Sequence, residues 1–129
     1  MSGVLIATSD RNQYLEMAEI LHQAGYEAEQ MIEPGSLIVN GLSRWALLVV
    51  DLDDKGMDKK FFAAVARRNP DLAVIGISDH KYHPNLKEAM SKCIRACLSK
   101  PVDEDEFVYL VKGLSGSGQR QNGNGGERV

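Results

Sequence analysis

The 129-residue sequence has no excess of basic residues, few aromatic residues and no long apolar segment. Its 15 lysines and arginines are outnumbered by 18 acidic residues, and aromatic residues make up only 6% of the chain. Such a chain lacks the basic surface typical of nucleic-acid-binding domains, so we expect no contact with nucleic acid. No segment approaches the roughly 20 apolar residues of a membrane-spanning helix. The apolar run near the N-terminus is too short for a signal peptide and has no basic leader. We therefore expect a cytoplasmic protein without membrane contact.

Cysteine is also scarce. The two cysteines, Cys93 and Cys97, stand four residues apart in "CIRAC". No second pair of cysteines or histidines has the spacing of a zinc site, so we interpret both as reduced thiols in the core. The histidines of "SDHKYHP", His80 and His83, are interpreted as solvated loop residues rather than metal ligands.

The length is sufficient for one domain with its own hydrophobic core. From Ser115 the sequence changes to "SGSGQRQNGNGGERV", which is rich in glycine, asparagine, glutamine and serine. A segment of this composition has too few apolar side chains to order itself. We therefore predict a domain over residues 1–114, followed by a flexible tail or linker over residues 115–129.

Short apolar runs alternate with helical patterns along the domain. The apolar runs are too short for helices and predict buried strands at residues 4–7, 46–50, 72–77 and 94–98. Apolar residues at helical spacing predict helices that include residues 14–21, 59–68, 84–90 and 103–114, with a weaker signal after Pro34. This alternation predicts an α/β fold, in which helices cover both faces of a parallel sheet.

Polar side chains follow each predicted strand. The first strand is followed by Thr8, Ser9 and Asp10, and later strands by Asp51, by Ser78 and Asp79, and by Ser99 and Lys100. In open parallel sheets, ligands and chemistry gather beyond the carboxyl ends of the strands. One carboxylate at such an end is a helix cap, a metal ligand or a nucleophile. Combined with a hydroxyl and a lysine from other strand ends, Asp51 predicts a functional site at this edge.

With these residues, positions 4–114 resemble the receiver domains of two-component response regulators. The resemblance depends on Asp51, on the "GMD" of residues 56–58, on Ser78, and on the "KPVDEDEF" of residues 100–107. It implies a doubly wound, five-stranded parallel sheet of the flavodoxin/CheY type. It also implies that the partners are signalling proteins: a sensor histidine kinase, or an output domain or other partner protein.

The resemblance further implies roles for three residues. Asp51 matches the phosphoacceptor, a carboxylate nucleophile toward a phosphohistidine donor. Ser78 matches the hydroxyl that hydrogen-bonds a phosphoryl oxygen, and Lys100 matches the ammonium that neutralises it.

The sequence departs from the receiver pattern at the metal. Receivers carry an acidic pair at the end of the first strand, which holds Mg²⁺, whereas this chain has Thr8 and Ser9 there. Neutral hydroxyls compensate poorly for the hydration shell of Mg²⁺. Without the metal, phosphoryl transfer to a carboxylate loses most of its charge neutralisation. We therefore expect no resident cofactor, and an ion pair between Asp51 and Lys100 that balances the charge of the site.

The alternative is that a substitute acid restores Mg²⁺ binding. The candidate metal ligands are then Asp10, Asp51 and Asp53, with Asp79 as a further nearby acid. Otherwise Asp10, Asp53 and Asp79 are solvated loop acids.

A second departure concerns the switch position. Receivers place an aromatic residue three positions before the lysine, and this chain has Cys97 there, without a ring to move. We therefore expect an atypical receiver-like domain that is not an enzyme and acts by protein–protein interaction. Its expected contact face is the last helix and the strand before it, with Glu106, Tyr109 and Lys112; a homodimer is one alternative. The other functional hypothesis is a receiver that is phosphorylated on Asp51.

Other uses of this fold lack their signatures. The loop after the first strand, "ATSDRNQY", has no glycine, which disfavours a flavin site, and no cysteine, which disfavours a phosphocysteine carrier. No Asp-x-His-x-x-Gly segment for a cobalamin site is present.

Overall fold

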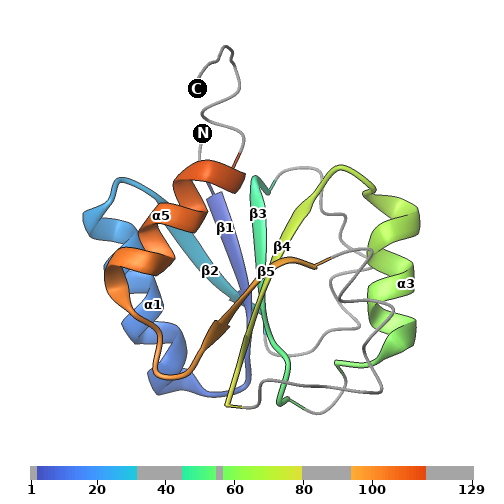
Figure 1. The fold of residues 1–129 in the computed structure, drawn as a ribbon, viewed down its shortest axis with the longest axis horizontal. Coiled ribbons are helices and arrows are strands. Elements are labelled where there is room, and N and C mark those ends of the chain that lie inside the picture. The colour runs from blue at the N-terminus through green and yellow to red at the C-terminus, as the bar shows by residue number, and fades with distance from the viewer. Residues whose placement is uncertain (1–2, 32–44, 55–56, 80–93, 116–129) are drawn as a thin grey trace.

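The computed structural model describes residues 3–31, 45–54, 57–79 and 94–115. Within these ranges, five strands form one parallel sheet in the order β2-β1-β3-β4-β5. The strands are β1 (Gly3–Ala7), β2 (Glu27–Met31), β3 (Leu47–Asp51), β4 (Ala73–Ser78) and β5 (Ile94–Ser99). The helices are α1 (Arg11–Gln23), α3 (Lys59–Arg68) and α5 (Glu104–Leu114). In Figure 1, α1 and α5 lie on one face of the sheet and α3 on the other. The predicted doubly wound α/β fold is confirmed.

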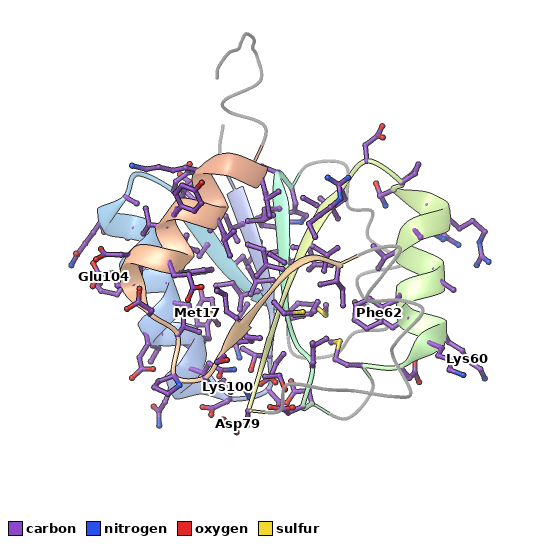
Figure 2. The ribbon with its side chains drawn as sticks, in the orientation of Figure 1. Met17, Lys60, Phe62, Asp79, Lys100 and Glu104 are labelled. Atoms are coloured by element: carbon purple, nitrogen blue, oxygen red, sulfur yellow. The ribbon has the colours of Figure 1, made fainter. Side chains whose placement is uncertain are left out.

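The core is divided in two by the sheet. Side chains alternate along a strand, so Val4 and Ile6 of β1 pack in one cluster with Met17 of α1, while Leu5 packs in the other with Phe62 of α3. Figure 2 shows Met17 and Phe62 pointing at the sheet from opposite sides. Both clusters contain fully buried side chains, so the helices are packed firmly against the two faces of the sheet. Because the strands are parallel, their carboxyl ends lie along one edge.

The three helices cover the predicted segments 14–21, 59–68 and 103–114, apart from the capping residue of the last. The caps of α1, α3 and α5 are aspartates whose side chains accept the main-chain N–H three residues on: Asp10 from Gln13, Asp58 from Phe61 and Asp103 from Glu106. Beyond α1, Gly25 has a φ of 93°, a left-handed conformation that favours glycine.

One strand was not located from the sequence. The segment "EAEQM" of β2 is at the edge of the sheet, and only its last residue, Met31, is buried. Alternation of exposed glutamates with half-buried residues gives no continuous apolar run, which is the signal that identified the central strands.

Other features singled out in the sequence have different outcomes in the structure. Trp45 lies against the amino end of β1, since a Cβ on Gly3 would approach its ring to 3.1 Å. Cys97 is a free thiol but is exposed on β5, so its assignment to the core is wrong. The predicted helices after Pro34 and over residues 84–90, together with His80, His83 and Cys93, lie outside the described residues, as does the tail beyond Ser115. None of the helices in the described ranges has the length and apolar character needed to cross a bilayer.

Candidate functional site

Three buried polar residues mark the carboxyl edge of the sheet. Among the described residues, those classed as buried and polar are Thr8, Asp51 and Ser78, with exposed fractions of 1%, 3% and 5%. Each stands at or directly after the end of a strand, β1, β3 and β4 respectively. Burial of a polar side chain is costly unless it is hydrogen-bonded, so their partners define the chemistry of this edge.

The carboxylate of Asp51 is surrounded by donors. Its Oδ1 accepts hydrogen bonds from Lys100 Nζ at 2.9 Å and from the main-chain N–H of Asp53 at 2.9 Å. Its Oδ2 accepts from Gln13 Nε2 at 2.8 Å and from Thr8 Oγ1 at 3.2 Å. A carboxylate offers about four lone-pair directions, so these four donors satisfy it. The predicted Asp51–Lys100 ion pair is confirmed.

Asp53 is a second carboxylate on the same ammonium. Its Oδ2 lies 3.1 Å from Lys100 Nζ and accepts the main-chain N–H of Asp79 at 2.8 Å, while its Oδ1 accepts the hydroxyl of Ser78 at 2.8 Å. Asp53 as a residue is exposed, as expected of a loop acid, but its side chain is only 19% exposed and contacts Ser78, Asp79 and Lys100, so its carboxylate is paired rather than freely solvated. The expected charge balance is wrong, because two carboxylates share the single ammonium of Lys100.

Lys100 joins the loops after β3 and β5. Burial lowers the pKa of Lys100, but hydrogen bonds and charge interactions with Asp51 and Asp53 outweigh this effect, and the pKa is raised above its ordinary value of 10.5. Its main-chain N–H donates to the carbonyl of Ser78 at 2.9 Å, which also fastens it to β4. Figure 2 shows Lys100 and Asp79 at the same edge of the molecule. The ammonium is therefore a fixed positive charge at this edge.

A third carboxylate holds the loop after β1. Asp54 accepts both the main-chain N–H of Ser9 at 2.7 Å and its hydroxyl at 2.8 Å. Asp10, whose side chain caps α1, donates its main-chain N–H to Thr8 Oγ1 at 3.1 Å. Sequence reasoning placed Asp54 at this edge but gave it no role, and it missed Gln13, which also donates to Thr8 Oγ1 at 3.0 Å. The available signal for Gln13 was its place in the first turn of the helix that starts beside the end of β1.

Comparison with known proteins gives matches at the level of structure. No protein-family model matches the sequence, and no curated protein does. A CheY-like response regulator receiver domain protein from Methanospirillum hungatei superposes with a TM-score of 0.77 at 19% identity, covering 89% of this chain and 94% of that one. The chain has the receiver-domain fold.

Two further solved structures are proteins from Burkholderia whose names assign them provisionally to pilus assembly. The protein from B. thailandensis, named CpaE, has a TM-score of 0.73 at 22% identity, covering 91% of this chain and 100% of that one. The protein from B. pseudomallei has a TM-score of 0.74 at 21% identity, covering 94% and 95%. Likeness at these identities concerns the fold alone.

The donor set of this receiver-fold site does not suit Mg²⁺. In the ranges that the structure describes, no group of three or more histidine, cysteine, aspartate or glutamate side chains is placed to hold a metal ion. The position of the acidic pair is taken by the hydroxyls of Thr8 and Ser9, which already bond to Asp51 and Asp54. Mg²⁺ requires near-octahedral oxygen ligands, and here the carboxylate oxygens accept hydrogen bonds from nitrogen and hydroxyl donors instead.

The resemblance of the sequence to receivers assigns roles to three further positions. Ser78 and Lys100, which match the phosphoryl-contact positions, reach the same carboxylate, that of Asp53. Cys97, at the switch position, is exposed on β5, where it pairs in register with Gly76 of β4.

Proposed function

We propose that this receiver-fold domain acts in signal transduction by protein–protein contact, without phosphoryl transfer to Asp51 and without Mg²⁺. The observation that supports the proposal is the saturated carboxylate of Asp51. A carboxylate nucleophile needs a free lone pair directed at the phosphorus. Here attack would first break a hydrogen bond of a side chain that is 4% exposed, and no metal would compensate the added negative charge.

The proposed contact face consists of α5 and β5. On α5, Glu106, Tyr109 and Lys112 are exposed, and Tyr109 has the most exposed large hydrophobic side chain in the described ranges, at 77%. Tyrosine is a common contact residue, because it combines a large apolar ring with a polar tip. The partner on this face is a signalling protein, such as a sensor kinase or an output domain, or a second copy of the chain. Since two structural neighbours are named for pilus assembly, components of such an assembly are also candidate partners.

The second candidate function is a phosphorylatable receiver. It is favoured by the convergence of Asp51, Ser78 and Lys100 on one edge of the sheet, the positions that the receiver pattern assigns to phosphoryl chemistry. In that case one of the nearby acids would have to leave its donors and bind Mg²⁺.

One challenge separates the two functions. The protein is treated with acetyl phosphate or beryllofluoride in the presence of Mg²⁺, and intact mass and amide NMR shifts are recorded for the wild type and Asp51→Asn. We expect no phosphoryl mass increase and no saturable shift at Asp51. A mass increase in the wild type that is lost in Asp51→Asn would overturn the proposal and establish the second function.

The contact face is tested by a matched pair of substitutions. Tyr109→Ala removes the exposed ring on α5, and Leu15→Ala removes the other exposed large hydrophobic side chain, at 48% exposure on α1. We expect Tyr109→Ala to weaken association with the partner and Leu15→Ala to leave it unchanged. Self-association is measured by sedimentation of both variants. Equal effects of the two substitutions would count against the α5–β5 face.

A further inference from the structure

Three donors from two strand ends converge on one carboxylate at this edge. The hydroxyl of Ser78 and the main-chain N–H of Asp79 come from the end of β4, and the ammonium of Lys100 comes from the end of β5. All three lie within 3.1 Å of the carboxylate oxygens of Asp53, which belongs to the loop after β3. A hydroxyl, a main-chain N–H and a cation directed at the two oxygens of one carboxylate form an oxyanion-binding arrangement.

This arrangement is not specific to a carboxylate. Phosphate oxygens accept hydrogen bonds from the same three kinds of donor, with similar distances and greater charge. The carboxylate of Asp53, however, is tethered to β3, so it competes as an intramolecular ligand with a high effective concentration. It also adds a negative charge next to Asp51, which repels an incoming anion.

We propose that Asp53 is an internal anionic ligand that fills an oxyanion site formed by Ser78, Asp79 and Lys100, and that it excludes inorganic phosphate from this site. The inference rests on the proposed function, in which the domain acts without a phosphoryl group on Asp51. It supplies a physical reason why the domain needs no such group. The loop after β4 is held against the loop after β3 by a residue of the chain itself, so no external anion is needed to hold it.

The test is a titration with inorganic phosphate at constant ionic strength. Amide NMR shifts of Asp79 and Lys100 are followed in the wild type and in Asp53→Ala. We expect Asp53→Ala to bind phosphate at least about tenfold more tightly than the wild type. If the internal ligand leaves the site free less than about a tenth of the time, the apparent phosphate affinity of the wild type is reduced by at least that factor. The added substitution Lys100→Met should abolish the gain.

Asp54→Ala is the matched control. It removes the same charge one residue away, but its carboxylate bonds to Ser9 and not to the oxyanion site. We expect Asp54→Ala to bind phosphate like the wild type. Equal affinity of the wild type and Asp53→Ala would overturn the proposal, and so would an equal gain in Asp54→Ala, which would indicate a general effect of charge.

A second variant covers the case in which Asp53→Ala is unfolded. If Asp53→Ala does not fold, Asp53→Asn replaces it: the amide retains the size of the side chain but not its charge, and phosphate should again bind more tightly than in the wild type. The titration contains no phosphoryl donor and forms no covalent bond. Phosphorylation of wild-type Asp51 by acetyl phosphate would therefore overturn the proposed function, whereas the Asp53 inference depends only on the phosphate affinities.

Discussion

Gln13 in the first turn of α1 donates a hydrogen bond from Nε2 to Asp51 Oδ2 at 2.8 Å, across 38 positions of sequence. The same Nε2 lies 3.0 Å from Thr8 Oγ1, which itself donates to Asp51. A helix, a strand end and a loop are thus joined at one carboxylate by neutral donors. An acidic residue at either position would repel the carboxylate of Asp51. The neutral donors Gln13 and Thr8 instead stabilise its negative charge.

Asp51→Asn should therefore destabilise the fold. The asparagine amide has one NH₂ group, which must face either Lys100 and the Asp53 N–H or Gln13 and Thr8, so two donors lose their acceptor. Buried donors without a partner cost about 1–3 kcal/mol, and we expect a loss of about 2 kcal/mol in the free energy of unfolding. Urea denaturation measures it. Asp54→Asn, whose carboxylate forms exposed hydrogen bonds with Ser9, should cost less than half as much. A stabilising Asp51→Asn would contradict this account of the site.

The stability of the protein should depend on Lys100 at alkaline pH. Because the pKa of Lys100 in the folded protein is raised above 10.5, its ion pairs stabilise the fold fully below that pH. This contribution is lost as the pH rises through the raised pKa. Lys100→Met should cost about 3 kcal/mol at neutral pH, since it leaves Asp51 without its cation. The difference from the wild type should stay constant up to about pH 10 and shrink above it.

The matched control is Lys112→Met, which removes an exposed lysine from α5. Its free energy of unfolding should follow that of the wild type at every pH. The titration of Lys100 itself is read from the NMR shift of its side-chain Cε. A midpoint below that of the exposed lysines would show that burial outweighs the two carboxylates, and would contradict the prediction.

Three acids at the end of β3 and in the loop after it differ in their partners. Asp51, Asp53 and Asp54 look alike in "DLDD", yet each serves a different set of donors: Asp51 those of Thr8, Gln13 and Lys100, Asp53 those of β4 and β5, and Asp54 those of Ser9. Alternating apolar runs sufficed to predict the α/β fold and the edge of the sheet that carries the site, and the resemblance to receiver domains implied the Asp51–Lys100 pair. The direction of each loop side chain depends on main-chain geometry that no spacing rule encodes, so the role of Asp53 was not predicted.

Strand β2 shows the same limit in the fold. Central strands are buried on both faces and read as continuous apolar runs, as "LLVVD" of β3 does. An edge strand needs only enough apolar side chains to cover one face, and "EAEQM" is held mainly by its pairing with β1. Its place in the sheet follows from long-range contacts rather than from its own composition.

Gly76 in the middle of β4 should not tolerate a larger residue. A Cβ at this position would lie 2.8 Å from Leu52 Cδ1 and 3.1 Å from Leu52 Cγ, in a buried part of the core. We expect Gly76→Ala to cost about 1–3 kcal/mol in the free energy of unfolding, as overpacking does. In a Leu52→Ala background the same substitution should cost much less, which a double-mutant cycle measures.

Gly113 on α5 provides the control for glycine itself. A Cβ there meets no atom within 4 Å, so Gly113→Ala should be neutral or stabilise the helix by up to about 1 kcal/mol. If Gly76→Ala cost equally in both backgrounds, the cause would lie in the strand and not in the contact with Leu52.

Restoring the acidic pair should restore Mg²⁺ binding. Thr8→Asp places a carboxylate beside Asp51, since Thr8 Oγ1 now lies 3.2 Å from Asp51 Oδ2, and Ser9→Asp places a second one beside Asp54, since Ser9 Oγ now lies 2.8 Å from Asp54 Oδ1. Repulsion among the acids should destabilise the metal-free variant relative to the wild type. Mg²⁺ at about ten times a millimolar Kd should then stabilise it by about 1.4 kcal/mol through mass action. Thermal unfolding with and without Mg²⁺ measures the effect. The neutral control, Thr8→Asn with Ser9→Asn, should not respond. Because the proposed function assumes that the native hydroxyls exclude the metal, an equal Mg²⁺ response of the wild type would refute that assumption.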